Sequence, residues 1–314
     1  SSYSGWRSRL RREACCRLTN RVDGLMSTPR RWKLLEILEE TSRFFIDKDI
    51  PDARLQAELL LADLLCLKRL DLYLQFDRPL HDEEVDRYRS YVRQRLKRVP
   101  LQYIVGTAAF RHLELSVTSD VLIPRPETEI LVDIALEKLA DVSGPHCLDL
   151  CCGSGAIGLS LAYENAEAIV TGSDLSQDAV AVSSANARKC ALEERVEWLC
   201  GDLFTTVVDR QFHLISCNPP YICHADIATL EPEVRDHEPH LALDGGEDGL
   251  AFYRQICSAA SDFLFPGGHL LLEVGEGQAD QVRALLQQTG AYGSVDVSVD
   301  LNDIPRVVVA EKNS

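Results

Sequence analysis

The chain has 314 residues, of which 46% are hydrophobic and 26% are charged, so it can bury a substantial core in one large or two ordinary domains. Its net charge of −16 disfavours generic binding to nucleic-acid phosphates, and no run of 18 apolar residues indicates a membrane span. Eleven cysteines, an odd number without any C-x-x-C spacing, indicate reduced thiols of a cytoplasmic protein rather than disulfides or a metal site.

Residues 1–25 differ in charge from the rest of the chain, because they contain six arginines and only two acidic residues. A start rich in arginine and serine is also typical of organellar transit segments. However, Met26 is the only methionine, and it directly precedes the first helical pattern. We therefore expect Met26 to be the natural start and residues 1–27 to be a disordered extension.

Residues 28–98 have the apolar spacing of a small helical bundle. Residues 99–124 change character, because apolar side chains alternate with polar ones after Gly106, and this alternation predicts a β-hairpin that begins near residue 101. We expect this hairpin to link the helical domain to a second domain at residues 125–314.

Beyond residue 125, strands and helices alternate in the manner of an open, largely parallel sheet. A periodic apolar face from Thr128 to Leu139 predicts the first helix of this region, and the last two strands are expected to form an antiparallel edge. The predicted fold is therefore α/β, with a Rossmann-like seven-stranded sheet that follows a helical bundle and a hairpin linker. The expected strands cover residues 146–151, 168–173, 195–200, 212–217, 268–274, 293–299 and 305–311, and the helices between them cover about 156–164, 176–190, 248–264 and 277–289.

The segment HCLDLCCGSGAIGLSLA, residues 146–162, combines a strand, a turn and the start of a helix. Gly153, Gly155 and Gly158 follow a G-x-G-x-x-G pattern, which permits a tight turn and close approach of a ligand to the helix N-terminus. Asp174 ends the next predicted strand, where it can accept hydrogen bonds from ribose hydroxyls. These features predict a nucleotide-like ligand without specifying which one.

Two further acids favour S-adenosylmethionine over a nicotinamide cofactor. Asp149 lies four residues before Gly153, where a carboxylate can meet a cationic amino-acid amine. Asp202, in CGDLF, follows the next strand and is placed for an adenine amine, with Leu203 as apolar cover. Each acid alone is commonly a turn or cap residue. Three acids at successive strand ends, however, share the binding edge of an open sheet.

The stretch LISCNPPYICH, residues 214–224, runs from an apolar strand into Asn218. Because Pro219 and Pro220 lack an N–H, the strand cannot continue. The carboxamide of Asn218, the neighbouring free carbonyls and the flat ring of Tyr221 would suit a planar NH2 group. A proline-rich turn after a buried strand is the structural alternative.

In this order, LDLCCGSGAIGLSLA, GSD, GDLF and NPPY resemble the motifs of class I S-adenosylmethionine-dependent methyltransferases of the amino-methylating kind. The segments PLQYIVGTAAFRHLELSVTSDVLIPRPETE and EPHLALDGGEDGLAFY narrow the resemblance to release-factor glutamine methyltransferases of the HemK/PrmC type, over about residues 30–311. The departure is the pair Cys151 and Cys152, where small residues such as glycine or threonine are usual. Thiols there would modestly reshape the methionine end of the pocket.

The resemblance implies methyl transfer from S-adenosylmethionine to the glutamine side-chain amide in the Gly-Gly-Gln loop of peptide chain release factors. It implies a catalytic set of Asn218, Pro219, Pro220 and Tyr221. The cofactor would be bound, without a metal, by Asp149, Cys151, Cys152, Gly153, Ser154, Gly155, Asp174, Leu175, Asp202, Leu203 and Asn218. The substrate pocket would include Arg125, Glu127, Thr128 and Glu129, although PRPETE is equally a good helix N-terminus.

Other functions share part of this pattern. NPPY also occurs in methyltransferases that act on exocyclic amines of nucleic acids, and a related enzyme methylates a glutamine of a large-subunit ribosomal protein. The net negative charge of the chain argues against a nucleic-acid substrate. The segment PRPETE fits the release-factor branch better than the branch that methylates a ribosomal protein. A non-catalytic module is disfavoured by the intact NPPY and the three strand-end acids. We therefore expect a cytoplasmic, monomeric enzyme whose helical domain recognises the release factor.

Overall fold

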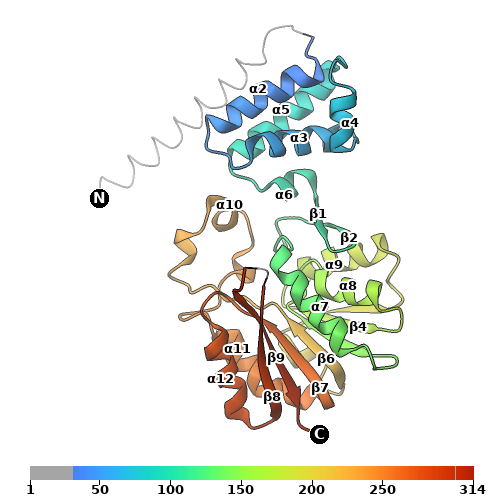
Figure 1. Cartoon of the computed structure of the whole chain (residues 1–314), viewed down its shortest axis with the longest axis vertical. Coiled ribbons are helices and arrows are strands. Elements are labelled where there is room, and N and C mark those ends of the chain that lie inside the picture. Colours follow the sequence, from blue (N-terminus) through green and yellow to red (C-terminus); the bar gives the residue numbers. More distant parts are fainter. Residues whose placement is uncertain (1–30, 301) are drawn as a thin grey trace, which may run out of the picture. The chain divides into compact units, whose positions relative to one another are not determined.

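A computed structural model describes residues 31–300 and 302–314. The chain divides into two compact units, the first ending at Val105 and the second beginning at Gly106 (Figure 1). The expected extension at residues 1–27 and the expected natural start at Met26 lie outside the described residues. Within the described ranges, no helix is both long enough and apolar enough to cross a membrane.

The first unit is helical, as the apolar periodicity of residues 28–98 predicts. Phe45, Leu60 and Tyr88 come from three different helices and are fully buried, and the Tyr88 hydroxyl donates a hydrogen bond to the carbonyl oxygen of Ala57 over 2.9 Å. The apolar stripe of each helix therefore faces a shared core. The helices of this unit are α2 (Leu34–Ile46), α3 (Ala53–Leu64), α4 (Arg69–Leu74), α5 (Asp82–Leu96) and α6 (Leu101–Val105).

The predicted hairpin is present as β1 (Thr107–Phe110) and its antiparallel partner β2 (Leu113–Ser116). The predicted start near residue 101 is wrong, because residues 101–105 form the short helix α6. Pro100 explains the helix: its φ suits a first helical turn, and its carbonyl oxygen accepts a hydrogen bond from the Ile104 N–H over 3.2 Å. The chain becomes extended only after Gly106, which has a φ of 79°.

The second unit contains a seven-stranded sheet in the order β5-β4-β3-β6-β7-β9-β8. Strands β3 to β7 pair in parallel, whereas β9 is antiparallel to both β7 and β8. The predicted seven-stranded sheet with an antiparallel end is therefore confirmed. The strands are β3 (His146–Leu150), β4 (Ile169–Asp174), β5 (Val196–Cys200), β6 (Phe212–Cys217), β7 (Leu264–Glu273), β8 (Tyr292–Val299) and β9 (Pro305–Lys312).

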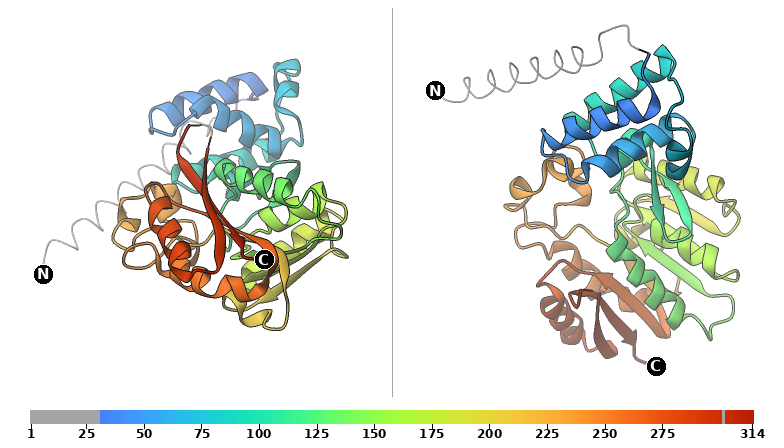
Figure 2. Two further views of the ribbon diagram at one scale, coloured as in Figure 1. Left: turned by 60° about the horizontal axis from the view of Figure 1, so that its bottom comes forward. Right: turned by 45° about the horizontal axis from the view of Figure 1, so that its top comes forward.

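Helices cover both faces of this sheet (Figures 1 and 2). The helices α7, α8 and α9 pack on one face, and α11 and α12 pack on the other. Within β3, Cys147 belongs to the core on the first face and Leu148 to the core on the second. Burial on both faces explains why the central strands are apolar at nearly every position. The helices are α7 (Glu129–Lys138), α8 (Ala156–Glu164), α9 (Gln177–Lys189), α11 (Ala251–Ala259) and α12 (Ala279–Thr289).

The carboxyl ends of the parallel strands lie at one edge of the sheet. Strands β4 and β5 are added to the sheet on one side of β3, and β6 and β7 are then added on its other side. In open α/β sheets, ligands bind at such a reversal of strand order. Short helical segments follow several strands: η1 (Pro126–Thr128), η2 (Leu203–Thr206), η3 (Ile227–Thr229), α10 (Pro232–Arg235), η4 (His240–Ala242) and η5 (Ala260–Phe263).

Candidate active site

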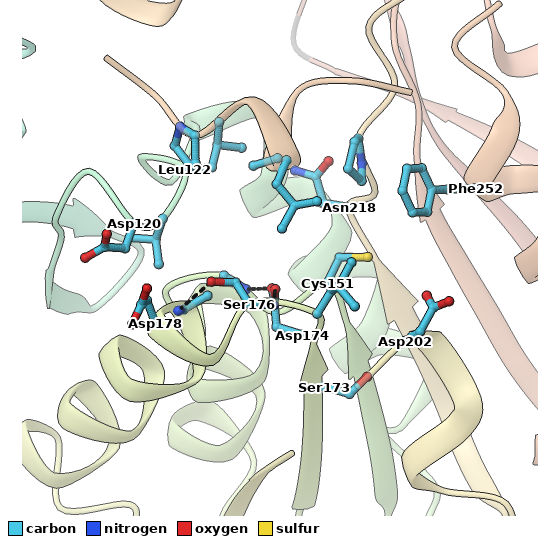
Figure 3. Close-up of a pocket in the computed structure, with 18 of the residues that line it drawn as sticks. Asp120, Leu122, Cys151, Ser173, Asp174, Ser176, Asp178, Asp202, Asn218 and Phe252 are labelled. Atoms are coloured by element: carbon cyan, nitrogen blue, oxygen red, sulfur yellow. Dashed lines mark hydrogen bonds between the residues drawn. The ribbon is translucent and has the colours of Figure 1, made fainter. Parts of the chain in front are cut away.

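A cavity of about 260 Å³ opens at the carboxyl ends of β3, β4, β5 and β6 (Figure 3), close to the lower end of the size range of small-molecule pockets, which is roughly 300 Å³. Each of these strands, or the loop directly after it, contributes to the wall. The contributions are Cys151 and Gly153 after β3, Ser173 and Asp174 of β4, Gly201 and Asp202 after β5, and Asn218 and Pro220 after β6.

The glycine loop and Asp174 form one wall of the cavity. Cys151 and Gly153 have positive φ angles of 55° and 51°, which turn the chain sharply between β3 and α8. The Asp174 carboxylate accepts hydrogen bonds from the N–H groups of Gly153 and Ser176, each over 2.9 Å. Burial nevertheless raises the pKa of Asp174, because the low dielectric disfavours its charge. The carboxylate is therefore positioned by the backbone and lines the cavity.

Asp149 lies beneath the loop rather than in the cavity wall. Its side chain is 1% exposed, and it accepts hydrogen bonds from the Gly158 N–H over 3.0 Å and from the Ser216 hydroxyl over 3.2 Å. Burial raises its pKa to about 7. The structure thus shows Asp149 orienting the start of α8, and its predicted contact with the cofactor amine stays a prediction.

The glycines of the loop also make room for Trp198 of β5. A Cβ atom added to Gly155 would lie 2.9 Å from the indole ring, and one added to Gly172 of β4 would lie 2.2 Å from it. Real Cβ atoms essentially never approach so closely, so these positions require glycine for packing. Gly153, in contrast, has open space around its Cα and a positive φ. The G-x-G-x-x-G pattern therefore combines turn geometry with packing against an aromatic ring.

The NPPY segment follows β6 on the opposite side of the cavity from Asp174 (Figure 3). The Asn218 carboxamide donates a hydrogen bond from Nδ2 to the Thr128 hydroxyl over 3.2 Å. The carbonyl oxygen of Tyr221 accepts a hydrogen bond from Gln278 Nε2 over 2.9 Å. A Cβ atom added to Gly249 would lie 2.4 Å from this same carbonyl oxygen. The segment is therefore held between Gln278, the residue before α12, and the glycine-rich loop of DGGEDG.

The PRPETE residues surround the site without lining the cavity. Arg125 forms an ion pair with Glu238 over 2.6 Å, and the carboxylate of Glu238 is almost completely buried. Glu129 accepts a hydrogen bond from the Arg111 N–H over 3.0 Å, and Glu127 is exposed. Of this group, Thr128 reaches the NPPY segment, through its hydrogen bond from Asn218.

The cavity brings together about half of the predicted cofactor and catalytic residues. Those that line it are Cys151, Gly153, Asp174, Leu175, Asp202, Leu203, Asn218 and Pro220. Those outside its lining are Asp149, Cys152, Ser154, Gly155, Pro219 and Tyr221. Further lining residues were not predicted from the sequence, and they include Asp120, Asp178, Leu241 and Phe252. Two of these, Leu241 and Phe252, belong to the segment EPHLALDGGEDGLAFY. The resemblance of that segment to the family was therefore the sequence signal that could have identified them as cavity residues.

The electrostatic character of the cavity is strongly acidic. Four aspartates line it, namely Asp120, Asp174, Asp178 and Asp202, and no Lys, Arg or His is found among its described lining residues. A pyrophosphate would meet these carboxylates without any cation to neutralise it, whereas a positively charged ligand would be attracted. The cavity therefore suits a cationic nucleoside better than a dinucleotide. In residues 31–300 and 302–314, no group of three or more His, Cys, Asp or Glu is placed to hold a metal.

Comparison with known proteins identifies the family. The PrmC N-terminal domain matches residues 36–106, and the methyltransferase small domain matches residues 127–247. A release factor glutamine methyltransferase from Geobacter sulfurreducens is 43% identical over 283 residues, which cover 89% of this chain and 97% of that protein. One from Chlorobaculum tepidum is 40% identical and covers 88% of this chain and 96% of that protein. The chain belongs to the release factor glutamine methyltransferase family.

Among solved structures, the hMettl16 catalytic domain in complex with the MAT2A 3′UTR hairpin 1 has a TM-score of 0.52 and 11% identity, covering 76% of this chain and 86% of that chain. This likeness shows a shared fold and nothing further about substrate. The fold of this chain agrees with the sequence-based resemblance to the release factor glutamine methyltransferase family.

The pair Cys151 and Cys152 stands where the sequence resemblance leads us to expect small residues. Cys151 lines the cavity, whereas Cys152 is buried behind it. Burial raises the pKa of the Cys152 thiol well above its ordinary value, so this side chain is a neutral, apolar packing group. Of the pair, Cys151 therefore changes the surface that a ligand meets.

Proposed function

We propose that this chain transfers a methyl group from S-adenosylmethionine to the side-chain amide nitrogen of the glutamine in the Gly-Gly-Gln loop of peptide chain release factors. The observation that supports this proposal most is the placement of Asn218. Its carboxamide lies at the wall of an acidic cavity and is held by Thr128. Because release factors act in translation, we infer a cytoplasmic enzyme.

The residues of the cavity fit S-adenosylmethionine. Asp174 is placed to accept hydrogen bonds from the ribose hydroxyls, and Asp202 with Leu203 to meet the adenine. Phe252, which also lines the cavity, offers a flat apolar surface (Figure 3). Charge-assisted bonds to a carboxylate are about twice as strong as neutral ones. When bound, the cofactor supplies an electrophilic methyl group on a positively charged sulfonium.

The nucleophile is a poor one, because the lone pair of an amide nitrogen is delocalised into its carbonyl. Asn218 Oδ1 and the Pro219 carbonyl can each accept one N–H bond of the substrate amide and so fix the direction of its nitrogen. Neither proline donates a competing hydrogen bond. The contribution of these residues is therefore orientation and electrostatics, in a site that holds the two reactants together.

Tyr221 contributes to this arrangement through its backbone carbonyl and its ring rather than by proton transfer. Burial raises the pKa of its phenol, so the hydroxyl stays neutral at physiological pH. Gln278 bonds the carbonyl of Tyr221 and also accepts the N–H of Gly275 over 3.0 Å. Gln278 thus links the proposed catalytic segment to the start of α12. The ring of Tyr221 is available to pack against the substrate amide.

We further propose that residues 28–98 form the domain that recognises the release factor away from its reacting loop. Large apolar side chains are exposed on and next to α4: Leu70 is 70% exposed, Leu74 is 73% exposed and Phe76 is 53% exposed. Clustered apolar side chains on a surface commonly mark an interaction site. A protein substrate fits the net negative charge of this chain better than a nucleic acid does.

The test is incubation of the purified chain with labelled S-adenosylmethionine and, separately, with a release factor, a large-subunit ribosomal protein carrying a methylatable glutamine, and RNA. We expect label in the release factor, and mass mapping should place it on the Gly-Gly-Gln glutamine. A factor whose glutamine is replaced by alanine is the matched control and should stay unlabelled. Exclusive labelling of either other substrate would overturn the proposal.

A further inference from the structure

The NPPY segment, residues 218–221, is held by a hydrogen bond at each end. At its start, Asn218 Nδ2 donates to the Thr128 hydroxyl over 3.2 Å. At its end, the carbonyl oxygen of Tyr221 accepts from Gln278 Nε2 over 2.9 Å. The two residues between these points are prolines, whose φ angles are restricted, so few backbone rotations remain free. The position of the proposed acceptors for the substrate amide therefore depends on how firmly Tyr221 is held.

Gln278 connects the NPPY segment to two other segments. It directly precedes α12 and does not line the cavity. Besides its bond to Tyr221, Nε2 donates to the carbonyl oxygen of Gly249 over 3.4 Å, and Oε1 accepts from the Gly275 N–H over 3.0 Å. The backbone N–H of Gln278 also donates to the carbonyl oxygen of Gly275 over 3.1 Å. One carboxamide thus joins the NPPY segment, the DGGEDG loop and the turn after β7.

The three partners permit one orientation of this carboxamide. Two of them are carbonyl oxygens, which only accept, and the third is an N–H group, which only donates. The nitrogen end must therefore face Tyr221 and Gly249, and the oxygen end must face Gly275. A flipped carboxamide would place oxygen against two oxygens and nitrogen against an N–H group. The position requires a donor and an acceptor in one plane, and glutamine provides both.

Three buried glycines leave Tyr221 little room to move. A Cβ atom added to Gly245 would lie 2.7 Å from Tyr221 Cα, and one added to Gly249 would lie 2.4 Å from the Tyr221 carbonyl oxygen. A Cβ atom added to Gly275 would lie 3.0 Å from the ring atom Cδ2. The glycines allow this close approach of backbone to Tyr221. They confine the residue, and the bond from Gln278 sets the direction of its carbonyl.

We propose that Gln278 is a positioning residue for methyl transfer, which keeps the NPPY segment in the geometry in which Asn218 and Pro219 accept the substrate amide. This inference rests on the proposed function. None of the three residues that Gln278 bonds belongs to the cavity lining. Loss of this side chain should therefore slow the transfer step and leave cofactor binding intact.

Gln278→Met is the first test, because methionine has a similar length and can replace none of the three hydrogen bonds. With saturating S-adenosylmethionine and a full-length release factor, the single-turnover rate should fall about tenfold to a hundredfold, the scale expected for misplacing a reacting group by about 1 Å. The dissociation constant for S-adenosylmethionine, measured by calorimetry, should stay within about twofold of the wild-type value.

Gln288→Met is the matched control, because Gln288 is exposed on the same helix and does not line the cavity. This variant should change neither the rate nor the affinity. Rates are divided by the fraction of protein that binds cofactor, so that a loss of folded enzyme does not count as slower transfer. A Gln278→Met rate within about threefold of wild type overturns the inference, and so does a parallel loss of rate and cofactor affinity.

Gln278→Glu separates hydrogen bonding from packing. Glutamate has nearly the same shape as glutamine, but its carboxylate cannot donate to the carbonyl oxygens of Tyr221 and Gly249. Because an oxygen would then face two other oxygens, this variant should be at least as slow as Gln278→Met. A rate close to that of wild type would show that shape alone is sufficient, and it would overturn the proposal.

Gly275→Ala perturbs the same contacts without replacing Gln278, and it decides the question where the Gln278 variants fail to fold. The φ of Gly275 is not positive, but the added Cβ atom would lie 2.8 Å from Gln278 Oε1 and 3.0 Å from Tyr221 Cδ2. We expect slower transfer with unchanged cofactor affinity.

Gly293→Ala, in β8, is the matched control for this variant. Its φ is not positive either, and the added Cβ atom would meet the Asn313 side chain at 3.0 Å, so the transfer rate should not change. A Gly275→Ala rate equal to that of this control overturns the proposal. A wild-type enzyme without any transfer to release factors would instead refute the proposed function.

Discussion

Replacing Asp174 by alanine tests the cofactor site most directly. Its carboxylate lines the cavity and is held by two backbone N–H groups of the glycine loop and of the start of α9. The variant would lose two charge-assisted bonds to the ribose, each worth about 1.5–3 kcal/mol. It would also release the Gly153 N–H, so that the loop is less well ordered before the cofactor binds.

The lower estimates for these two bonds sum to about 3 kcal/mol of binding free energy. This loss corresponds to a dissociation constant for S-adenosylmethionine that is roughly a hundredfold larger. Isothermal titration calorimetry on the cofactor alone measures this change without a protein substrate. Asp174→Asn keeps one acceptor oxygen and should lose less affinity than Asp174→Ala.

Asp141→Ala is the matched control for net charge. Asp141 is exposed and does not belong to the cavity lining, so its removal should leave the affinity within about twofold, since distant surface charges are screened by salt. If Asp174→Ala binds S-adenosylmethionine as tightly as this control does, the assignment of Asp174 to the cofactor is refuted.

Three other perturbations probe separate parts of the structure. Asn218→Ala should leave cofactor affinity nearly unchanged and lower the single-turnover rate by about two to three orders of magnitude; a rate within about threefold of wild type would contradict the amide-positioning role. Asp149→Asn should change how stability depends on pH: because burial raises the folded-state pKa to about 7, the folded state binds more protons than the unfolded state, and the free energy of unfolding of the wild type should fall as pH rises from about 4 to about 7. Denaturant unfolding of the cofactor-free proteins should show a smaller fall in the variant, and identical slopes would be inconsistent with this carboxyl. Leu74→Glu should reduce methylation of a full-length release factor and not of a short Gly-Gly-Gln peptide, as measured by kcat/KM on both substrates; equal effects on the two would argue against docking at α4.

Local sequence patterns were sufficient for much of the fold and for several residues that line the cavity. Strand, glycine loop and helix follow each other within residues 146–162, and the turn after β3 depends on backbone angles that glycine allows, such as the positive φ at Gly153. The end of β6 just before Asn218 follows from the two prolines, which cannot extend a strand. The same local logic failed at residues 101–105, where Pro100 begins a helix that the neighbouring alternation conceals.

Other properties of the site depend on residues that only the folded chain brings together. Trp198 occupies the space left by Gly155 and Gly172, so part of the glycine pattern serves packing that no single segment shows. Asp149 and Asp174 both follow the rule of an acid at a strand end, yet one bonds the start of α8 beneath the loop and the other lines the cavity. Burial and neighbouring charge arise from elements distant in sequence, and they determine which carboxyl is ionised and what it can bind.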